Sequence, residues 1–296
     1  MFTVAKIEGN NISFLELKNS QGTKAIISLY EGGRLKDLKL NNQYLIKDNV
    51  DFPYTESYAS SILFPFASRI EGGKYSFKDQ EYQLNCNESG KNALHGLVYN
   101  KKFILVDKVE NSTKCAVTIA YKEEKESAGF PYTYEIYLTY TLSEKGIDLS
   151  IKIKNTDTKP YPFTLGWHPY FLCDDLKNSS LKFKSDQQIN FDENLITKEV
   201  LAYKGDEVFE IKEQQLDDCF ILKTNKIGFS TPKYQIEITT NLKENYLQMY
   251  TPINQSIIAI EPMTGVSNSF NNKIGLQVLQ PNQTYTLTCN VKLTNQ

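Results

Sequence analysis

The sequence contains very little histidine and arginine. Its 296 residues include two histidines, and the 33 basic residues are lysines except for Arg34 and Arg69. They are mixed along the chain with 35 acidic residues, giving a formal net charge of −2. A basic stripe, which binding to nucleic acid or to an anionic membrane requires, is therefore missing. We expect neither kind of partner.

Paired cysteines and long apolar runs are also missing. The five cysteines are scattered and never form a CxxC pair, which argues against a disulfide framework or a zinc site and favours a reducing compartment. No apolar run approaches the roughly 18 residues that span a bilayer. Residues 1–10 lack the features of a signal peptide, and no glycine-rich phosphate loop is present. The sequence therefore predicts a cytoplasmic protein without a metal or nucleotide cofactor.

Alternation of apolar and polar side chains with a period of two dominates the chain. Residues 134–142 and 147–154 both follow this pattern, and Ser-Glu-Lys-Gly joins them, which predicts a long antiparallel hairpin over residues 132–155. Further strands are expected over 12–17, 25–29, 74–77, 102–106, 116–121, 220–222, 235–239, 247–250, 257–260 and 285–293. No segment shows a sustained helical pattern. We therefore predict an all-β fold, a large antiparallel β-sandwich of two sheets packed face to face, as one domain over residues 1–296.

Both histidines lie in unusual local sequences. His95 ends the run Asn-Ala-Leu-His before Gly96, and His168 lies in Gly-Trp-His-Pro-Tyr-Phe. Histidine is the side chain that titrates near neutral pH, so it is a common proton carrier in catalysis. The apolar and aromatic neighbours of His168 predict a partly dehydrated imidazole with a lowered pKa. A purely structural role is the alternative for each histidine.

Other charged residues are expected at the ends of strands. Arg69 follows the apolar segment 62–64, and Glu261 follows four apolar residues. Asp217 and Asp218 open another strand. A carboxylate beside apolar residues is costly to desolvate, and burial raises its pKa toward the range of a general base. With neighbouring aromatic residues these groups are typical of a polar sugar-binding cleft, while surface ion pairs and turn caps are the alternatives.

Four ordered motifs resemble the aldose 1-epimerase (galactose mutarotase) family. They are S-R-I-E-G-G-K-Y-S-F…N-A-L-H-G over residues 68–96, H-P-Y-F over 168–171, D-x-x-F over 217–220, and Q-M-Y-T with I-E-P-M-T-G over 248–251 and 260–265. Their order and spacing extend over about residues 30–295, nearly the whole chain. Leu97 stands where many members have a second glycine, which indicates a divergent branch.

The resemblance implies a β-sandwich of the galactose mutarotase-like (supersandwich) type, and an isomerase that interconverts the α and β anomers of a free aldose. In this assignment Glu261 is the general base for the C1 hydroxyl and His168 is the general acid for the ring oxygen. His95 helps to polarise that oxygen, and Arg69 and Asp217 bind other hydroxyls. The implied partner is a small-molecule sugar, no cofactor is needed, and the chain is a monomer or a homodimer.

Three other functions remain open. A hexose-6-phosphate mutarotase needs a phosphate site, usually built from arginines, and the chain has only two. A glycoside hydrolase with Glu261 and Asp217 as its carboxylate pair would leave the two histidines unexplained. A non-catalytic carbohydrate-binding protein would keep the aromatic and hydroxyl-binding groups without the acid and the base. Neither the preferred sugar nor the distance between Glu261 and His168 follows from the sequence.

Overall fold

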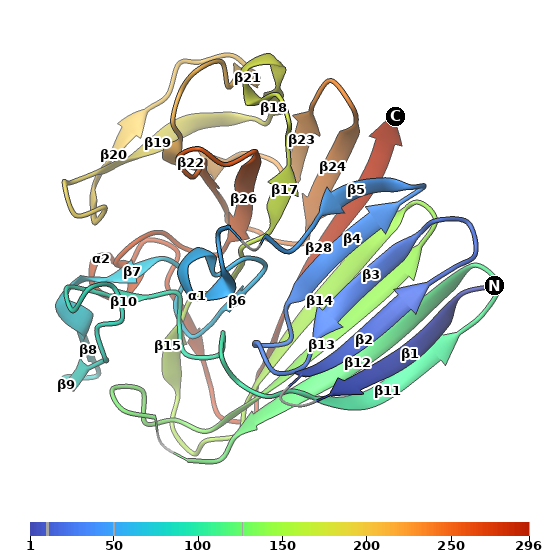
Figure 1. Cartoon of the computed structure of the whole chain (residues 1–296). Coiled ribbons are helices and arrows are strands. Elements are labelled where there is room, and N and C mark those ends of the chain that lie inside the picture. Colours follow the sequence, from blue (N-terminus) through green and yellow to red (C-terminus); the bar gives the residue numbers. More distant parts are fainter. Residues whose placement is uncertain (10–11, 50, 126, 296) are drawn as a thin grey trace.

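The computed structural model describes residues 1–9, 12–49, 51–125 and 127–295, and β-strands dominate it (Figure 1). The strands pair antiparallel within these residues, which confirms the predicted all-β antiparallel fold. The helices are single turns: α1 (Tyr54–Ser57), α2 (Ser269–Asn272) and 3-10 turns at Glu71–Gly73 and Leu176–Asn178. No helix in the described ranges has the length and apolar character needed to cross a membrane.

The largest sheet contains the predicted hairpin. β13 (Tyr134–Ser143) and β14 (Gly146–Asn155) are paired with Ser143 opposite Gly146. Every second side chain of β13 is buried, from Tyr134 to Leu142, because successive side chains of a strand point to opposite faces. The sheet has nine strands in the order β11 (Ile104–Glu110), β12 (Lys114–Glu123), β13, β14, β28 (Thr284–Asn295), β24 (Gln235–Thr240), β23 (Lys226–Ser230), β18 (Ser180–Lys182) and β21 (Val208–Glu210).

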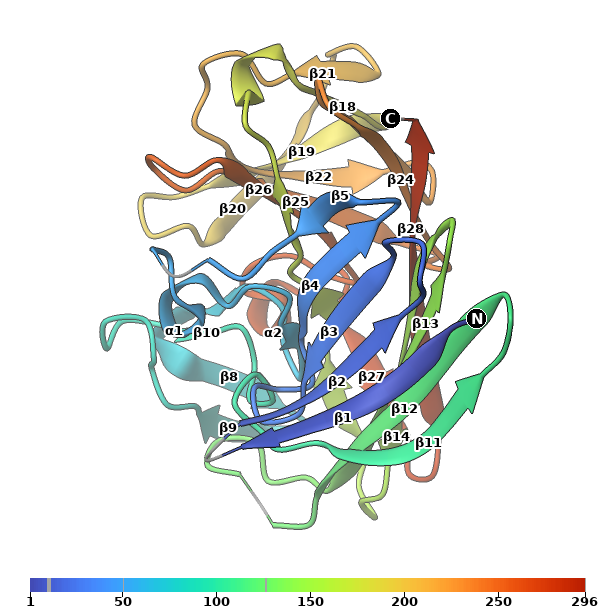
Figure 2. The same cartoon turned by 45° about the vertical axis from the view of Figure 1, so that its right-hand side comes forward.

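Two smaller sheets cover the nine-stranded one (Figures 1 and 2). One contains β1 (Thr3–Gly9), β2 (Ile12–Lys18), β3 (Lys24–Ser28), β4 (Leu35–Leu40) and β5 (Gln43–Ile46). The other has the order β20 (Thr197–Ala202), β19 (Ser185–Phe191), β22 (Asp217–Leu222), β25 (Asn245–Tyr250), β26 (Ile257–Met263), β16 (Gly166–Trp167) and β6 (Ile62–Leu63), with β17 (Tyr170–Leu172) also paired to β26. The second layer of the sandwich is thus divided, with β5 lying beside β17.

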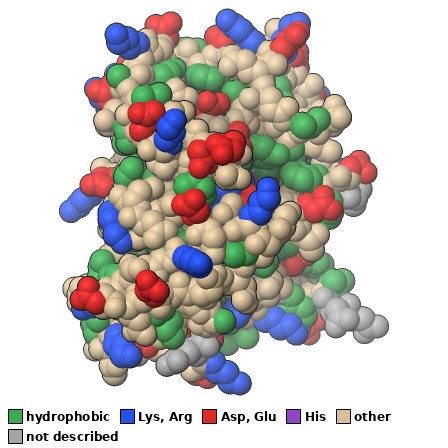
Figure 3. All heavy atoms as spheres, turned by 90° about the vertical axis from the view of Figure 1, so that its left-hand side faces the viewer, with side chains coloured by type: hydrophobic (Ala, Val, Ile, Leu, Met, Phe, Trp, Pro, Cys, Tyr) green, Lys and Arg blue, Asp and Glu red, His purple; other side chains and the backbone are tan. Residues whose placement is uncertain are grey.

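One hydrophobic core joins all three sheets. It includes Leu17 from β2, Leu138 from β13 and Ile260 from β26, each with no exposed surface. Two-stranded pairs complete the fold: β7 (Arg69–Ile70) with β10 (Ala93–Leu94), β8 (Lys74–Phe77) with β9 (Gln80–Gln83), and β15 (Tyr161–Phe163) with β27 (Gln277–Leu279). Basic and acidic side chains are interspersed over the face drawn in Figure 3, in agreement with the mixed charge of the sequence.

Candidate active site

The five residues selected from the sequence line one cavity. Glu261, His168, His95, Arg69 and Asp217 all contribute to its wall, and its volume is about 290 Å³, at the lower end of the range for small-molecule sites. The remaining lining residues are polar, acidic, aromatic or leucine: Phe52, Glu56, Ser57, Tyr58, Ser68, Glu88, Leu94, Tyr170, Leu195, Gln248 and Tyr250.

Three neighbouring strands of the eight-stranded sheet supply the acidic side of the cavity. Gln248 on β25 is paired with Glu261 on β26, and its Nε2 donates a hydrogen bond of 2.7 Å to Oδ1 of Asp217 on β22. Asp218 points to the opposite face because side chains alternate along a strand, and there it accepts a hydrogen bond of 2.9 Å from Gln188. Asp217 is therefore the aspartate that reaches the cavity.

Glu261 does not lie at the end of its strand, so that prediction is wrong. β26 continues through Glu261 and Pro262 to Met263. Proline has no N–H to donate, and it is tolerated in a sheet where no partner needs that donor. On one side of β26, β17 pairs only with residues 257–259 and β16 only with Met263. Pro262 lies in this gap.

The same gap places His168 beside Glu261. The N–H groups of Ile260 and Thr264 donate to the carbonyls of Pro169 and Leu165, at 3.2 and 2.8 Å. His168 lies between these two anchored points, in the short connection between β16 and β17.

His168 and Glu261 are in direct contact. His168 Nε2 lies 3.3 Å from Glu261 Oε1, and the two side chains are 5% and 3% exposed. Both residues line the cavity, so a single ligand bound there can reach both groups. This contact is the central geometric feature of the site.

Burial shifts the pKa values of this pair in opposite directions. Desolvation lowers the pKa of His168 to about 4, and it raises the pKa of Glu261 well above its usual value, with Asp217 adding to the rise. Both shifts favour the uncharged forms. When the pair holds one proton, these shifts favour the form with protonated Glu261 and neutral His168.

His95 is held by the backbone around it. Its N–H donates to the Ser68 carbonyl at 2.9 Å, and its φ is 60°. Gly96 follows with a φ of 78°, and a Cβ there would lie 2.2 Å from the Phe64 carbonyl oxygen, so glycine is required. The His95 ring is perpendicular to the His168 ring at a centroid distance of 4.9 Å. Burial, with contributions from His168 and Arg69, lowers the pKa of His95 well below its usual value.

Asp217 is another carboxyl group with a perturbed pKa. Burial raises the pKa of Asp217 to about 6, the nearby Asp218 and Glu88 add to the rise, and Arg69 opposes it. The group therefore changes charge near pH 6.

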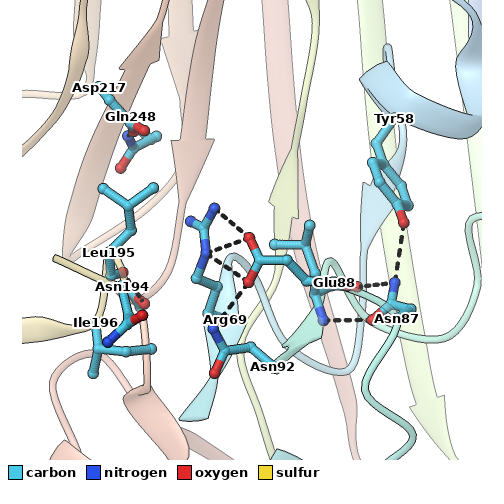
Figure 4. A network of polar contacts seen from close by, with 12 residues as sticks. Tyr58, Arg69, Asn87, Glu88, Asn92, Asn194, Leu195, Ile196, Asp217 and Gln248 are labelled. Atoms are coloured by element: carbon cyan, nitrogen blue, oxygen red, sulfur yellow. Dashed lines mark hydrogen bonds and ion pairs between the residues drawn. The ribbon is translucent and has the colours of Figure 1, made fainter. Parts of the chain in front are cut away.

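Arg69 lies in its own short strand, β7, rather than at the end of the strand expected over residues 62–64. Its Nε lies 2.9 and 3.1 Å from the two carboxylate oxygens of Glu88, and Nη2 lies 2.7 Å from Oε1 (Figure 4). Asn92 Nδ2 donates to the same carboxylate at 2.9 Å. The surface ion pair considered as an alternative is thus a partly buried pair in the cavity wall.

Glu88, Gln248 and Tyr58 are among the lining residues that were not identified as site residues from the sequence. Glu88 lies in a polar turn, Gln248 in an ordinary strand, and Tyr58 in a segment with positive φ that only the structure reveals. The Tyr58 hydroxyl accepts a hydrogen bond of 3.0 Å from Asn87, whose side chain also holds the backbone of Leu94. Gln248 could have been found from the sequence, because it lies two residues before Tyr250 in a motif that was already recognised. No sequence feature pointed to Glu88.

The chain is similar in sequence and in fold to known proteins. The chain is 24% identical over 273 residues to the uncharacterized protein YihR of Escherichia coli, covering 88% of this chain and 87% of that protein. Its fold matches a galactose mutarotase-like protein of Clostridium acetobutylicum with a TM-score of 0.89 and 20% identity, covering 100% and 99% of the two chains. It also matches galactose 1-epimerase of Lactobacillus acidophilus with a TM-score of 0.82 and 18% identity, again covering 100% and 99%.

The family model described as aldose 1-epimerase matches residues 13–292. This range contains the cavity and all of its lining residues. The chain therefore belongs to the aldose 1-epimerase family.

Proposed function

We propose that the protein interconverts the α and β anomers of a free aldose. The observation that carries this proposal is the contact of 3.3 Å between His168 Nε2 and Glu261 Oε1 in the wall of the cavity. Ring opening of a hemiacetal needs one proton removed from the C1 hydroxyl and one delivered to the ring oxygen. Both oxygens are bonded to the same carbon, so a base and an acid in contact can reach both at once.

The protons balance over one turnover. Glu261 takes the proton of the C1 hydroxyl while His168 gives a proton to the ring oxygen, so the bond between C1 and the ring oxygen breaks and an aldehyde forms. After rotation about the bond between C1 and C2, the two groups reverse their roles and the ring recloses on the other face. The pair ends with the single proton with which it began.

Burial favours the uncharged arrangement of the pair, in which Glu261 carries the proton and His168 is neutral. The first step starts from the charged arrangement, with Glu261 ionised and His168 protonated, and proton transfer through the sugar takes the pair to this more favoured uncharged arrangement. A positioned acid or base contributes typically about 10²–10⁴-fold. No metal or nucleotide enters this sequence of steps.

The other lining residues bind and orient the sugar in this proposal. His95 lies against His168 and helps to polarise the ring oxygen. Asp217, held by Gln248, accepts hydrogen bonds from ring hydroxyls, and Arg69 donates to them. Tyr170 and Tyr250 offer flat faces for the C–H groups of the ring, since both line the cavity.

Polarimetry of freshly dissolved α-D-glucose and α-D-galactose tests the proposal. The wild type should accelerate the approach to anomeric equilibrium, and Glu261→Gln or His168→Asn should each lower the rate by about 100-fold or more. Asp218→Asn is the control, because Asp218 points away from the cavity, and its rate should equal that of the wild type.

Two results would reject the proposal. A wild-type protein that binds sugar without accelerating equilibration would be a carbohydrate-binding protein. Full activity of Glu261→Gln would remove the general base from the mechanism.

A further inference from the structure

Arg69 is the arginine of the cavity wall, and the fork of N–H donors on its guanidinium group is already occupied by Glu88. The chain has 33 lysines and arginines in total. Among the described residues, Arg69 lines the cavity and no lysine does. Glu88 accepts from both Nε and Nη2 of Arg69, and Figure 4 shows the two side chains facing each other. Recognition of a phosphate, sulfonate or carboxylate by arginine relies on such a fork of parallel donors.

Glu88 is held in this position from its own side. Its N–H donates to the Asn92 carbonyl at 3.1 Å, and the Asn92 side chain donates to its Oε2 at 2.9 Å. Asn92 is 5% exposed. The Glu88 carboxylate is therefore anchored next to Arg69 rather than meeting it by chance at the surface.

Carboxylates outnumber cations in the cavity. Glu88 balances Arg69, and Glu261 with His168 shares one proton and is neutral as a pair. Glu56 and Asp217 remain, and no ion pair is found for either of them among the described residues. An anionic substituent would enter a cavity with an excess of negative charge and no available cation, and juxtaposed like charges oppose binding.

We propose that Glu88 is a specificity-determining residue: by occupying the Arg69 fork it restricts the cavity to aldoses that are uncharged or carry an ammonium group. Aldoses that carry a phosphate, sulfonate or carboxylate are excluded. The hydroxyls of a neutral sugar need only single donors, and Arg69 Nη1, which has no acceptor among the described residues, supplies them. This inference rests on the proposed anomer interconversion and names the class of sugar that the site accepts.

Exchange NMR of anomers tests the inference with four substrates that differ in charge. The wild type should use glucose and glucosamine with kcat/KM values within about threefold of each other, and glucose 6-phosphate and glucuronate at least about tenfold less well. In Glu88→Gln, which keeps the size of the side chain, the ratio of kcat/KM for glucose 6-phosphate to that for glucose should rise at least about tenfold.

Two further variants separate the release of Arg69 from a general change of charge. Glu56→Gln removes one negative charge from the rim without freeing Arg69, and because Glu56 is exposed and its charge is screened, the ratio should change less than about threefold. The double variant Glu88→Gln/Arg69→Gln should lose the gain. Equal shifts in Glu56→Gln and Glu88→Gln would overturn the proposal.

Failure of this inference is distinguishable from failure of the proposed function. Wild-type protein that uses glucose 6-phosphate as well as glucose would overturn the role of Glu88 while supporting anomer interconversion. If no sugar is anomerised, titration of the same four sugars by NMR reports binding alone. Tighter binding of glucose than of glucose 6-phosphate, reversed in Glu88→Gln, would still support the inference, and an unchanged preference in Glu88→Gln would overturn it.

Discussion

Replacing Asp217 with asparagine tests the electrostatics of the cavity through stability. Burial raises the pKa of Asp217 to about 6, whereas an aspartate in an unfolded chain titrates near 3.9. Folding therefore disfavours the ionised form. The cost is absent below pH 4, grows between pH 4 and 6, and is complete above pH 6. Two pKa units correspond to about 3 kcal/mol, and partial solvent access reduces this to about 1–2 kcal/mol.

Asp217→Asn should remove this cost. The asparagine oxygen can still accept the hydrogen bond from Gln248, so we expect a variant that is about 1–2 kcal/mol more stable than the wild type at pH 8. The two proteins should be equally stable at pH 4. Urea unfolding between pH 4 and 8 gives both values, and the exposed control Asp206→Asn should stay within about 0.5 kcal/mol of the wild type at each pH. A variant that is less stable than the wild type at pH 8 would refute the claim that burial of ionised Asp217 destabilises the folded protein.

The site also makes two other predictions. The kcat/KM for a neutral aldose should fall as the pH drops through about 6, because protonated Asp217 accepts fewer hydrogen bonds from hydroxyls. In contrast, kcat should stay constant down to about pH 4, where His168 takes up a second proton for the pair. The fall of kcat/KM near pH 6 should be missing in Asp217→Asn, and a fall that persists in this variant would show that another group causes it. Gly96→Ala should lower stability by about 2–4 kcal/mol and reduce activity, because its Cβ would strike the Phe64 carbonyl next to His95. Gly90→Ala has a similar φ of 75° but open space around its Cβ, and should cost about 1 kcal/mol, as measured by thermal unfolding; equal costs for both variants would contradict the packing argument.

The long strands could be predicted from the sequence because each buries one face. The hairpin of β13 and β14 and the last strand, β28, follow the predicted alternation, with Leu138, Ile151 and Leu287 fully buried. Division of the second layer into two sheets could not be predicted, because alternation shows which side chains are buried but not which strands become neighbours.

The short elements around the cavity were harder to predict. The two-residue strand β7, which holds Arg69, and the positive φ of His95 depend on contacts with distant backbone such as Phe64 and Ser68. Proline inside a sequence usually argues against a central strand, because it has no N–H to donate. β26 nevertheless passes through Pro262, which requires a gap in the neighbouring strands.

The site residues were identified by their chemistry and motifs, and the structure added their mutual geometry. Glu261, His168, His95, Arg69 and Asp217 all line the cavity, but their catalytic and binding roles stay predictions. The ion pair between Arg69 and Glu88 could not be predicted, because the two residues lie 19 positions apart and no sequence pattern connects them.

The enzyme-dependent rate of anomer exchange in the double variant Glu261→Gln/His168→Asn tests the central claim most directly. If the two side chains pass a shared proton, removing either one disables the pair, so the double variant should be no slower than the slower single variant, about 100-fold below the wild type. Losses that multiply to about 10⁴-fold would show that the two residues act independently, and would contradict the proposed shared-proton mechanism.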